Sequence, residues 1–299
     1  MNKAPFIFAI LLVSACTASN DDNLPIDQGD TAVAEVEEIP LAVLIAAGVE
    51  RLNELRASTE LDSVENDAEL AAGCLAHIRY MAAHKKVIHD ENTQSEWYTP
   101  EGKTAGANAN VAGPVKNLVE AVDFWMASPY HRLPMLHPGL TNVGAALESG
   151  YACVDLHSSI DEIETFSPVP YPGDQQINVP MGFSSYGSLS PVPEEYSEPT
   201  GFIVSLTFPI KDLVALDFTA TLTNKNTGSA VEAFVRLPFD PNDPYAEFQQ
   251  NSVLLIPKQP LATGTQYEVK MKGLINDLEI EKLWSFTTAN PLSPPESTL

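Results

Sequence analysis

The stretch WMASPYHR, from Trp125 to Arg132, decides the fold of the first half of this chain. It closes an apolar run that is typical of a helix, and Pro129 ends that helix because proline has no amide hydrogen to donate. His131 follows at once, and the run NVGAAL at 142–147 has the composition of a buried strand. The stretch therefore predicts a helix that ends in a histidine-bearing turn beside a sheet.

Apolar residues with helical spacing extend this pattern toward the N-terminus. Residues at i, i+3, i+4, i+7, i+11 and i+14 from Leu41 form one apolar face and predict a first helix. A second helix is expected to begin at Asn66 as its N-cap, with Glu69 in the manner of a capping box. A third is expected over 115–128, and no regular element is predicted for the polar stretch 89–113.

Two short strands are expected after the third helix, at 142–147 and 151–156, with a hairpin turn at Ser149-Gly150. Helices that flank a small antiparallel sheet make a layered domain. The first half is therefore predicted to be an α+β domain.

This region resembles the bacterial CAP (SCP-like) family. The resemblance covers 40–156 and rests on the helix NDAELAAGCLAHIRYMA, on Asn53 with Arg56, on the SPYHR segment and on the run LHPGLTNVGAAL. It implies the α-β-α sandwich of CAP domains, an extracellular location and a central cleft that takes a ligand such as a sterol.

CAP proteins often place two histidines and two glutamates around that cleft, and the histidines can hold a divalent metal such as zinc. By resemblance, VIH places His89 at the first histidine, and SPYHR places His131 at the second. Both glutamate positions depart from the family pattern, because GANANVA has Ala109 and WMAS has Ser128. The nearest carboxylates that could replace them are those of Glu91 and Glu101.

A catalytic zinc site usually has three protein ligands and an open water position. Two imidazoles without the glutamates suit weak metal or ligand binding better than hydrolysis. The alternative for His89 and His131 is a structural role, with each ring acting as a hydrogen-bonding spacer.

The N-terminus has the features of an export signal. Residues 1–15 hold Lys3, the apolar run FIFAILLV and small residues that end at Cys16, too short for a membrane span. LVSAC resembles a lipobox, which implies cleavage before Cys16 and lipid on its sulfur; the alternative is ordinary signal cleavage with an incidental cysteine. Thr17 favours the outer membrane by resemblance to Gram-negative lipoproteins. The acidic segment 16–39 is expected to be a flexible tether.

The chain is strongly acidic, with a formal net charge of −24. Phosphate binding requires a basic surface, so nucleic acid is not expected as a partner. The charge suits solubility or attraction to cationic surfaces, and it equally fits the general acidity of secreted and halotolerant proteins.

Cys74 and Cys153 remain as a pair once Cys16 carries lipid. In an oxidising compartment we expect them to form a disulfide between a helix and a strand. The alternative is two buried free thiols, since cysteine is also a small apolar residue.

The second half has a different composition. Proline density rises over 157–200, which indicates a linker or a strap that lies against the first domain. Over 201–290 apolar and polar residues alternate, as at 267–271, and predict an all-β sandwich. The run SVLLIPKQPLATGTQYEVKMKG with WSFTT resembles a bacterial Ig-like domain of the S-layer type. Residues 291–299 are expected to form a C-terminal tail.

Three classes of function are consistent with these features. The preferred class is a lipid-anchored module of the cell envelope, at the outer membrane or cell surface, that binds a lipid, peptide or glycan. A metal-dependent hydrolase acting on peptide or envelope polymer is the first alternative, and it needs a carboxylate besides His89 and His131. A structural envelope or adhesion protein is the second, and the oligomeric state does not follow from the sequence.

Overall fold

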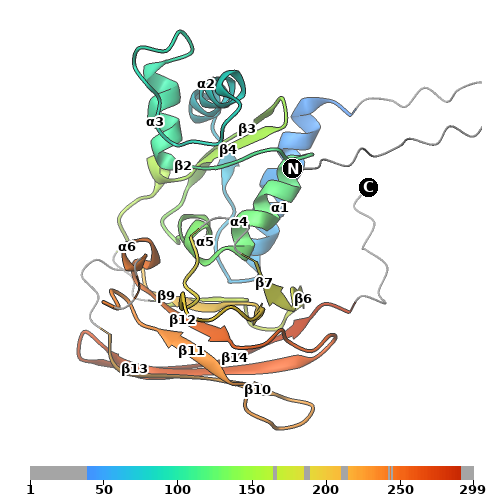
Figure 1. The fold of residues 1–299 in the computed structure, drawn as a ribbon, viewed down its shortest axis with the longest axis vertical. Helices are drawn as coiled ribbons and strands as arrows, with labels where there is room; N and C mark the ends of the chain where they lie inside the picture. Colours follow the sequence, from blue (N-terminus) through green and yellow to red (C-terminus); the bar gives the residue numbers. More distant parts are fainter. Residues whose placement is uncertain are drawn as a thin grey trace, which may run out of the picture. The chain divides into compact units, whose positions relative to one another are not determined.

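The fold is that of a computed structural model, shown in Figure 1. The structure describes residues 39–163, 167–184, 189–209, 215–241, 243 and 245–290. The predicted signal, Cys16, almost all of the tether and the C-terminal tail lie outside the described residues.

The helices are α1 (Leu41–Ala57), α2 (Ala68–His84), α3 (Pro100–Asn108), α4 (Leu118–Ala127), α5 (Pro129–Met135) and α6 (Ala246–Gln249), with a 3₁₀ turn, η1, at His157–Ser159. The strands are β1 (Glu65–Asn66), β2 (Ala109–Ala112), β3 (Asn142–Glu148), β4 (Tyr151–Asp155), β5 (Val169–Tyr171), β6 (Gln176–Val179), β7 (Gly182–Phe183), β8 (Thr200–Gly201), β9 (Val204–Thr207), β10 (Ala215–Asn224), β11 (Ala233–Arg236), β12 (Ser252–Pro257), β13 (Gln266–Ile275) and β14 (Leu278–Thr288).

The helix α2 begins one residue later than predicted. Its N-cap is Asp67, whose carboxylate accepts from the amides of Glu69 and Leu70, so the prediction of Asn66 as the cap was wrong. Asn66 instead ends β1, and its side chain bonds both backbone groups of Ala145 in β3. Asn66 is therefore bonded to the sheet, and Asp67 beside it caps the helix.

The stretch 89–113 contains two elements that the periodicity did not predict. The helix α3 begins where the side chain of Thr99 accepts from the amide of Gly102, with Pro100 in its first turn. Threonine as N-cap followed by proline is a helix-start signal, and Glu101 adds a negative charge to the first turn. The chain then becomes extended and forms β2.

Both faces of the first sheet, with the order β1-β3-β4-β2, are covered by helices. In β3, Val143, Ala145 and Leu147 share one apolar core with α1 and α4, whereas Ala146 shares another with α2 and α3. Figure 1 shows these layers. The alternation follows from the period of two in a strand and confirms the α-β-α sandwich.

The hairpin between β3 and β4 confirms the predicted turn. Ser149 and Gly150 have φ angles of 53° and 77°, and two successive positive φ values are typical of the tight turn that joins antiparallel strands. The strands themselves lie close to their predicted limits.

The second half forms two four-stranded sheets, with the orders β10-β13-β14-β6 and β11-β12-β9-β5. In β13, Tyr267, Val269 and Met271 are buried, while Lys270 and Lys272 form ion pairs with glutamates of β14. The predicted alternation is confirmed there, and with it the β-rich second half. Its likeness to an Ig-like domain stays a prediction.

The sheet that contains β9 and β12 is buried on both faces. Val204 and Leu255 lie in the core shared with the other sheet, whereas Ile203 and Leu254 pack with Tyr130 of α5. A strand covered on both sides is apolar along its buried length, so α5 explains why β12 has only apolar residues after Ser252.

Ile39–Leu299 group into one compact unit. The proline-rich stretch supplies β5 and β6, which pair with β9 and β14. Arg132 of α5 is fully buried, and its guanidinium carbon lies 4.7 Å from the ring centroid of Tyr171 and 5.1 Å from that of Phe202. The described parts of 157–200 therefore pack as a strap that contacts α5 and pairs with both sheets, and the predicted domain limits remain a prediction.

Candidate functional site

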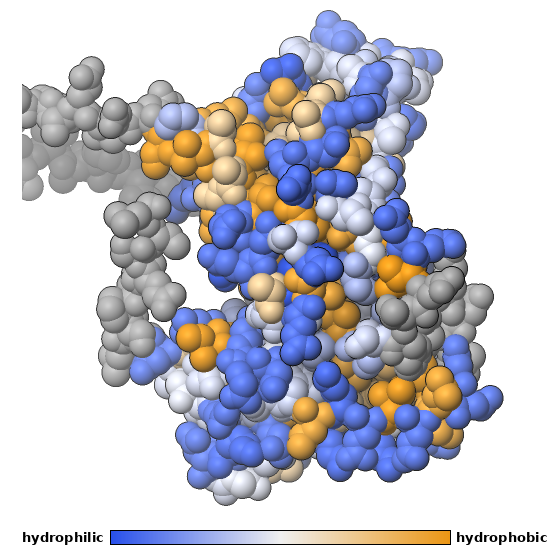
Figure 2. All heavy atoms as spheres, turned by 180° about the vertical axis from the view of Figure 1, so that it is seen from behind, coloured by the Kyte–Doolittle hydropathy of each residue, from blue (hydrophilic) through white to orange (hydrophobic). Residues whose placement is uncertain are grey.

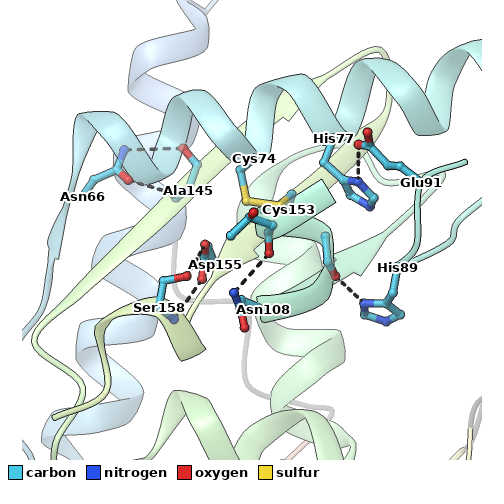
Figure 3. The surroundings of a disulfide bond; sticks show 12 residues. Asn66, Cys74, His77, His89, Glu91, Asn108, Ala145, Cys153, Asp155 and Ser158 are labelled. Atoms are coloured by element: carbon cyan, nitrogen blue, oxygen red, sulfur yellow. Dashed lines mark hydrogen bonds and ion pairs between the residues drawn. A yellow bond between two sulfur atoms is a disulfide. The ribbon is translucent and has the colours of Figure 1, made fainter. Parts of the chain in front are cut away.

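His89 lies in the segment between α2 and α3 and is exposed. Its Nδ1 lies 2.9 Å from the carbonyl oxygen of Gly106 in α3 (Figure 3). A carbonyl can only accept, so Nδ1 carries the hydrogen, and Nε2 of the neutral ring keeps its lone pair. A backbone carbonyl on one ring nitrogen is the usual support for a histidine that binds metal through the other.

His131 lies in α5 and is partly exposed. Its Nδ1 is 3.0 Å from the hydroxyl oxygen of Ser128, and the side-chain amide of Asn110 in β2 donates to its backbone carbonyl over 2.9 Å. The resemblance to the CAP family implies a glutamate at the position of this serine. Ser128 holds the ring by its Nδ1 side, so Nε2 is the nitrogen left for another partner.

His131 is affected electrostatically by its surroundings. Burial, and to a smaller extent the charge of His89, lower the pKa of His131 from 6.5 to about 4. His131 is therefore neutral at physiological pH, the form in which imidazole binds a metal. We call His89 and His131 together the histidine site.

A buried pair, His77 and Glu91, holds the segment that carries His89. His77 of α2 and Glu91 have fully buried side chains, with Nδ1 2.9 Å from Oε1, and Nε2 of His77 is 2.7 Å from the carbonyl oxygen of Ile88. His77 thus contacts the chain on both sides of His89, at Ile88 before it and at Glu91 after it. The other carboxylate oxygen of Glu91 accepts from the amide of Thr99.

Gly106 lets α3 approach His77 and His89 closely. A Cβ added there would lie 2.3 Å from Cε1 of His77 and 2.5 Å from the carbonyl oxygen of His89. Only a residue without a side chain fits between α3 and the two histidines. The close packing explains why the carbonyl of Gly106 is within reach of the ring of His89.

The two carboxylates suggested by the sequence are placed elsewhere. Glu91 is engaged with His77 and Thr99, and Glu101 is exposed in the first turn of α3. Among the described residues, no group of three or more His, Cys, Asp or Glu side chains is arranged to hold a metal ion. A metal bound at the histidine site therefore stays a prediction.

Cys74 and Cys153 form the predicted disulfide, which joins α2 to β4 (Figure 3). Both cysteines have no exposed surface and lie in the apolar core between α2, α3 and the sheet. An oxidised pair fits an extracellular location.

Two partners of the histidine site were not predicted from the sequence. Asn110 directly follows Ala109, one of the two positions where the resemblance implies a glutamate, so the run GANANVA was the signal that could have identified it. The carbonyl of Gly106 had no such signal, because a backbone acceptor depends on the course of the chain and not on residue type.

The comparison with family models identifies the first part of the chain. The model described as CAP: Cysteine-rich secretory protein family matches residues 49–157. This part is therefore a CAP family domain, of the class that is generally an extracellular ligand-binding module. No curated protein matches the chain. In the part of the chain that the structure describes, no helix is long and apolar enough to cross a membrane.

Proposed function

We propose that this chain is an extracytoplasmic ligand-binding protein, anchored in the cell envelope through lipid on Cys16. Its CAP domain takes a lipid, peptide or glycan beside the histidine site, and the two imidazoles hold a divalent cation such as zinc weakly. The observation that supports the proposal is that His89 and His131 come from distant segments and each have Nδ1 engaged by the protein, while the charge of His89 contributes to the lowered pKa of His131.

The residues present would fit zinc as two neutral nitrogen ligands. Bound there, the cation would offer open coordination positions to an oxygen-bearing group of a ligand. His131 supplies a nitrogen that is unprotonated down to about pH 5, because its pKa is lowered to about 4. Gly106 and Ser128 fix the orientation of the two rings.

A metal-dependent hydrolase would need a base or a third ligand at the same place. Ser128 is buried and bonded to His131 at one former glutamate position, and Ala109 in β2 has no polar side chain at the other. The donor set therefore favours binding over hydrolysis.

Calorimetric titration of zinc into the mature chain tests the metal site. We expect micromolar affinity that falls at least about tenfold in the double variant His89→Ala, His131→Ala, since each ligand is lost outright. The matched control is His84→Ala, His157→Ala, which removes two histidines outside the site. Equal binding by wild type and both double variants would make His89 and His131 structural.

The anchor is tested separately. The mature wild-type chain is expected to carry the mass of attached lipid, whereas Cys16→Ala is expected to lack it. A Cys16→Ala chain that keeps the lipid mass would contradict the anchor and leave the zinc result unaffected.

A further inference from the structure

The first turns of α1 have an unusual composition. From Ile39 to Val49 the sequence IPLAVLIAAGV contains no charged or polar side chain. A helix that is apolar all round is normally buried in a protein or a membrane. Here that part of the helix is near the surface of the described unit.

Large apolar side chains at this end are exposed to solvent. The exposed fraction is 58% for Ile39, 45% for Leu41 and 54% for Val43. Figure 2 shows apolar residues gathered on the surface where α1 begins. Beside them is an open groove of about 350 Å³ along the helix, lined by Ala42, Ile45, Ala46, Val49, Glu50 and Asn66.

The patch continues the buried face of the helix beyond the core. Gly48, Leu52 and Leu55 are buried against the sandwich, and Leu41 lies seven residues before Gly48 on the same face. Leu44 and Ile45 are half-buried against the same core, so the apolar stripe extends about one turn past the point where the protein covers it. Val43 adds exposed apolar surface on the opposite side of the helix.

We propose that the start of α1 inserts into the surface of the lipid bilayer that carries the anchor. The apolar end patch, defined as Ile39, Leu41 and Val43, would lie among the acyl chains, while the groove, whose lining includes Glu50, would stay at the level of the headgroups. The uncharged turns of the helix are roughly 13 Å long, enough to enter one leaflet and too short to span a bilayer. The proposal rests on the anchor of the proposed function for its biological setting.

The position of the patch in the chain favours lipid over a second copy. Residues 17–38 separate Cys16 from Ile39, and a segment of 22 residues spans at most about 75 Å even when fully extended. Lipid on Cys16 would therefore keep the patch near the bilayer, where weak insertion suffices. Glu37 and Glu38 directly precede the patch, so neutral lipids are preferred over anionic ones.

Flotation with vesicles tests the insertion without the anchor. The probe is the unlipidated mature chain, beginning at Thr17, with vesicles of phosphatidylcholine. We expect wild type to float, and the partition coefficient to fall at least about tenfold in Leu41→Gln, Val43→Gln, because two exposed apolar side chains are lost. High salt should not release the protein, and added phosphatidylglycerol should weaken its binding.

The matched control is Leu278→Gln, Leu283→Gln in β14, where the exposed fractions are 56% and 58%. It should float like wild type, and all three proteins should unfold at the same temperature. The proposal is overturned if wild type does not float, or if both double variants lose binding equally. It is also overturned if α1 instead forms a dimer in sedimentation experiments that the α1 variant abolishes. None of these outcomes depends on zinc or on lipidation of Cys16.

Discussion

His131 shows how a single buried ring makes stability depend on pH. Its pKa is 6.5 in the unfolded chain and about 4 in the folded protein. The unfolded state therefore binds more protons between these values, and the free energy of unfolding falls as the pH drops from about 6.5 to 4. We expect this ring to account for a loss on the order of 2 kcal/mol, since partial exposure weakens the effect.

Urea unfolding at pH 7 and pH 4 measures that contribution. His131→Gln should lose less stability than wild type between the two pH values, while His84→Gln, which changes an exposed histidine, should behave like wild type. An identical pH dependence in wild type and His131→Gln would contradict the lowered pKa.

The buried pair of His77 and Glu91 supports His89 by holding the segment that carries it. Glu91→Gln or His77→Phe leaves one polar partner buried without its match, and each is expected to cost about 3 kcal/mol or more. The double variant should cost less than the sum, with a coupling free energy of at least about 1 kcal/mol. A double-mutant cycle from urea unfolding checks this, and additive costs would show that the two side chains do not act as a pair.

Among the elements, the disulfide joins α2 to β4 across 79 residues of sequence. Closing a loop of this length reduces the conformational entropy of the unfolded chain, so the bond is expected to contribute about 4 kcal/mol in the chain-entropy model. Cys74→Ala, Cys153→Ala should lower the urea midpoint accordingly. If wild type and the double variant unfold at the same urea concentration, the bond adds nothing to stability.

The sequence predicted well those helices and strands whose buried residues are apolar and regularly spaced. Helices α1, α2 and α4 have a clear stripe, and β3, β4 and β13 alternate, so burial could be deduced from spacing alone. The short helices α3 and α5 begin at Pro100 and Pro129, where local signals and not periodicity identify them. The histidines were predicted from motifs, whereas the pairing of Glu91 with His77 depends on packing and could not be.

At the scale of the whole molecule, Arg132 links the CAP domain to the β-rich half. Its guanidinium donates to the carbonyls of Ile203 and Ala127 and lies over two aromatic rings. Burial lowers its pKa to about 10, so it stays charged. Arg132→Met would leave two buried carbonyls without donors, and we expect a loss of about 2–4 kcal/mol.

The shared core predicts that both halves unfold together. Trp125 of α4 and Phe202, next to β8, belong to the same apolar cluster, so scanning calorimetry should show one transition for wild type. Arg132→Met should lower its temperature, and Arg132→Lys should lower it less because an ammonium group can still reach one carbonyl. Two separate transitions in wild type would show that the halves fold independently.

The strap determines where the chain can be cut without removing a strand from either sheet. It contributes β5 to one sheet and β6 to the other, and each is the outermost strand of its sheet. A gene fusion that began the second half at Thr200 would remove both, and the exposed rows of backbone amides and carbonyls would invite aggregation. Any division of the chain that keeps both sheets complete must therefore fall before Val169.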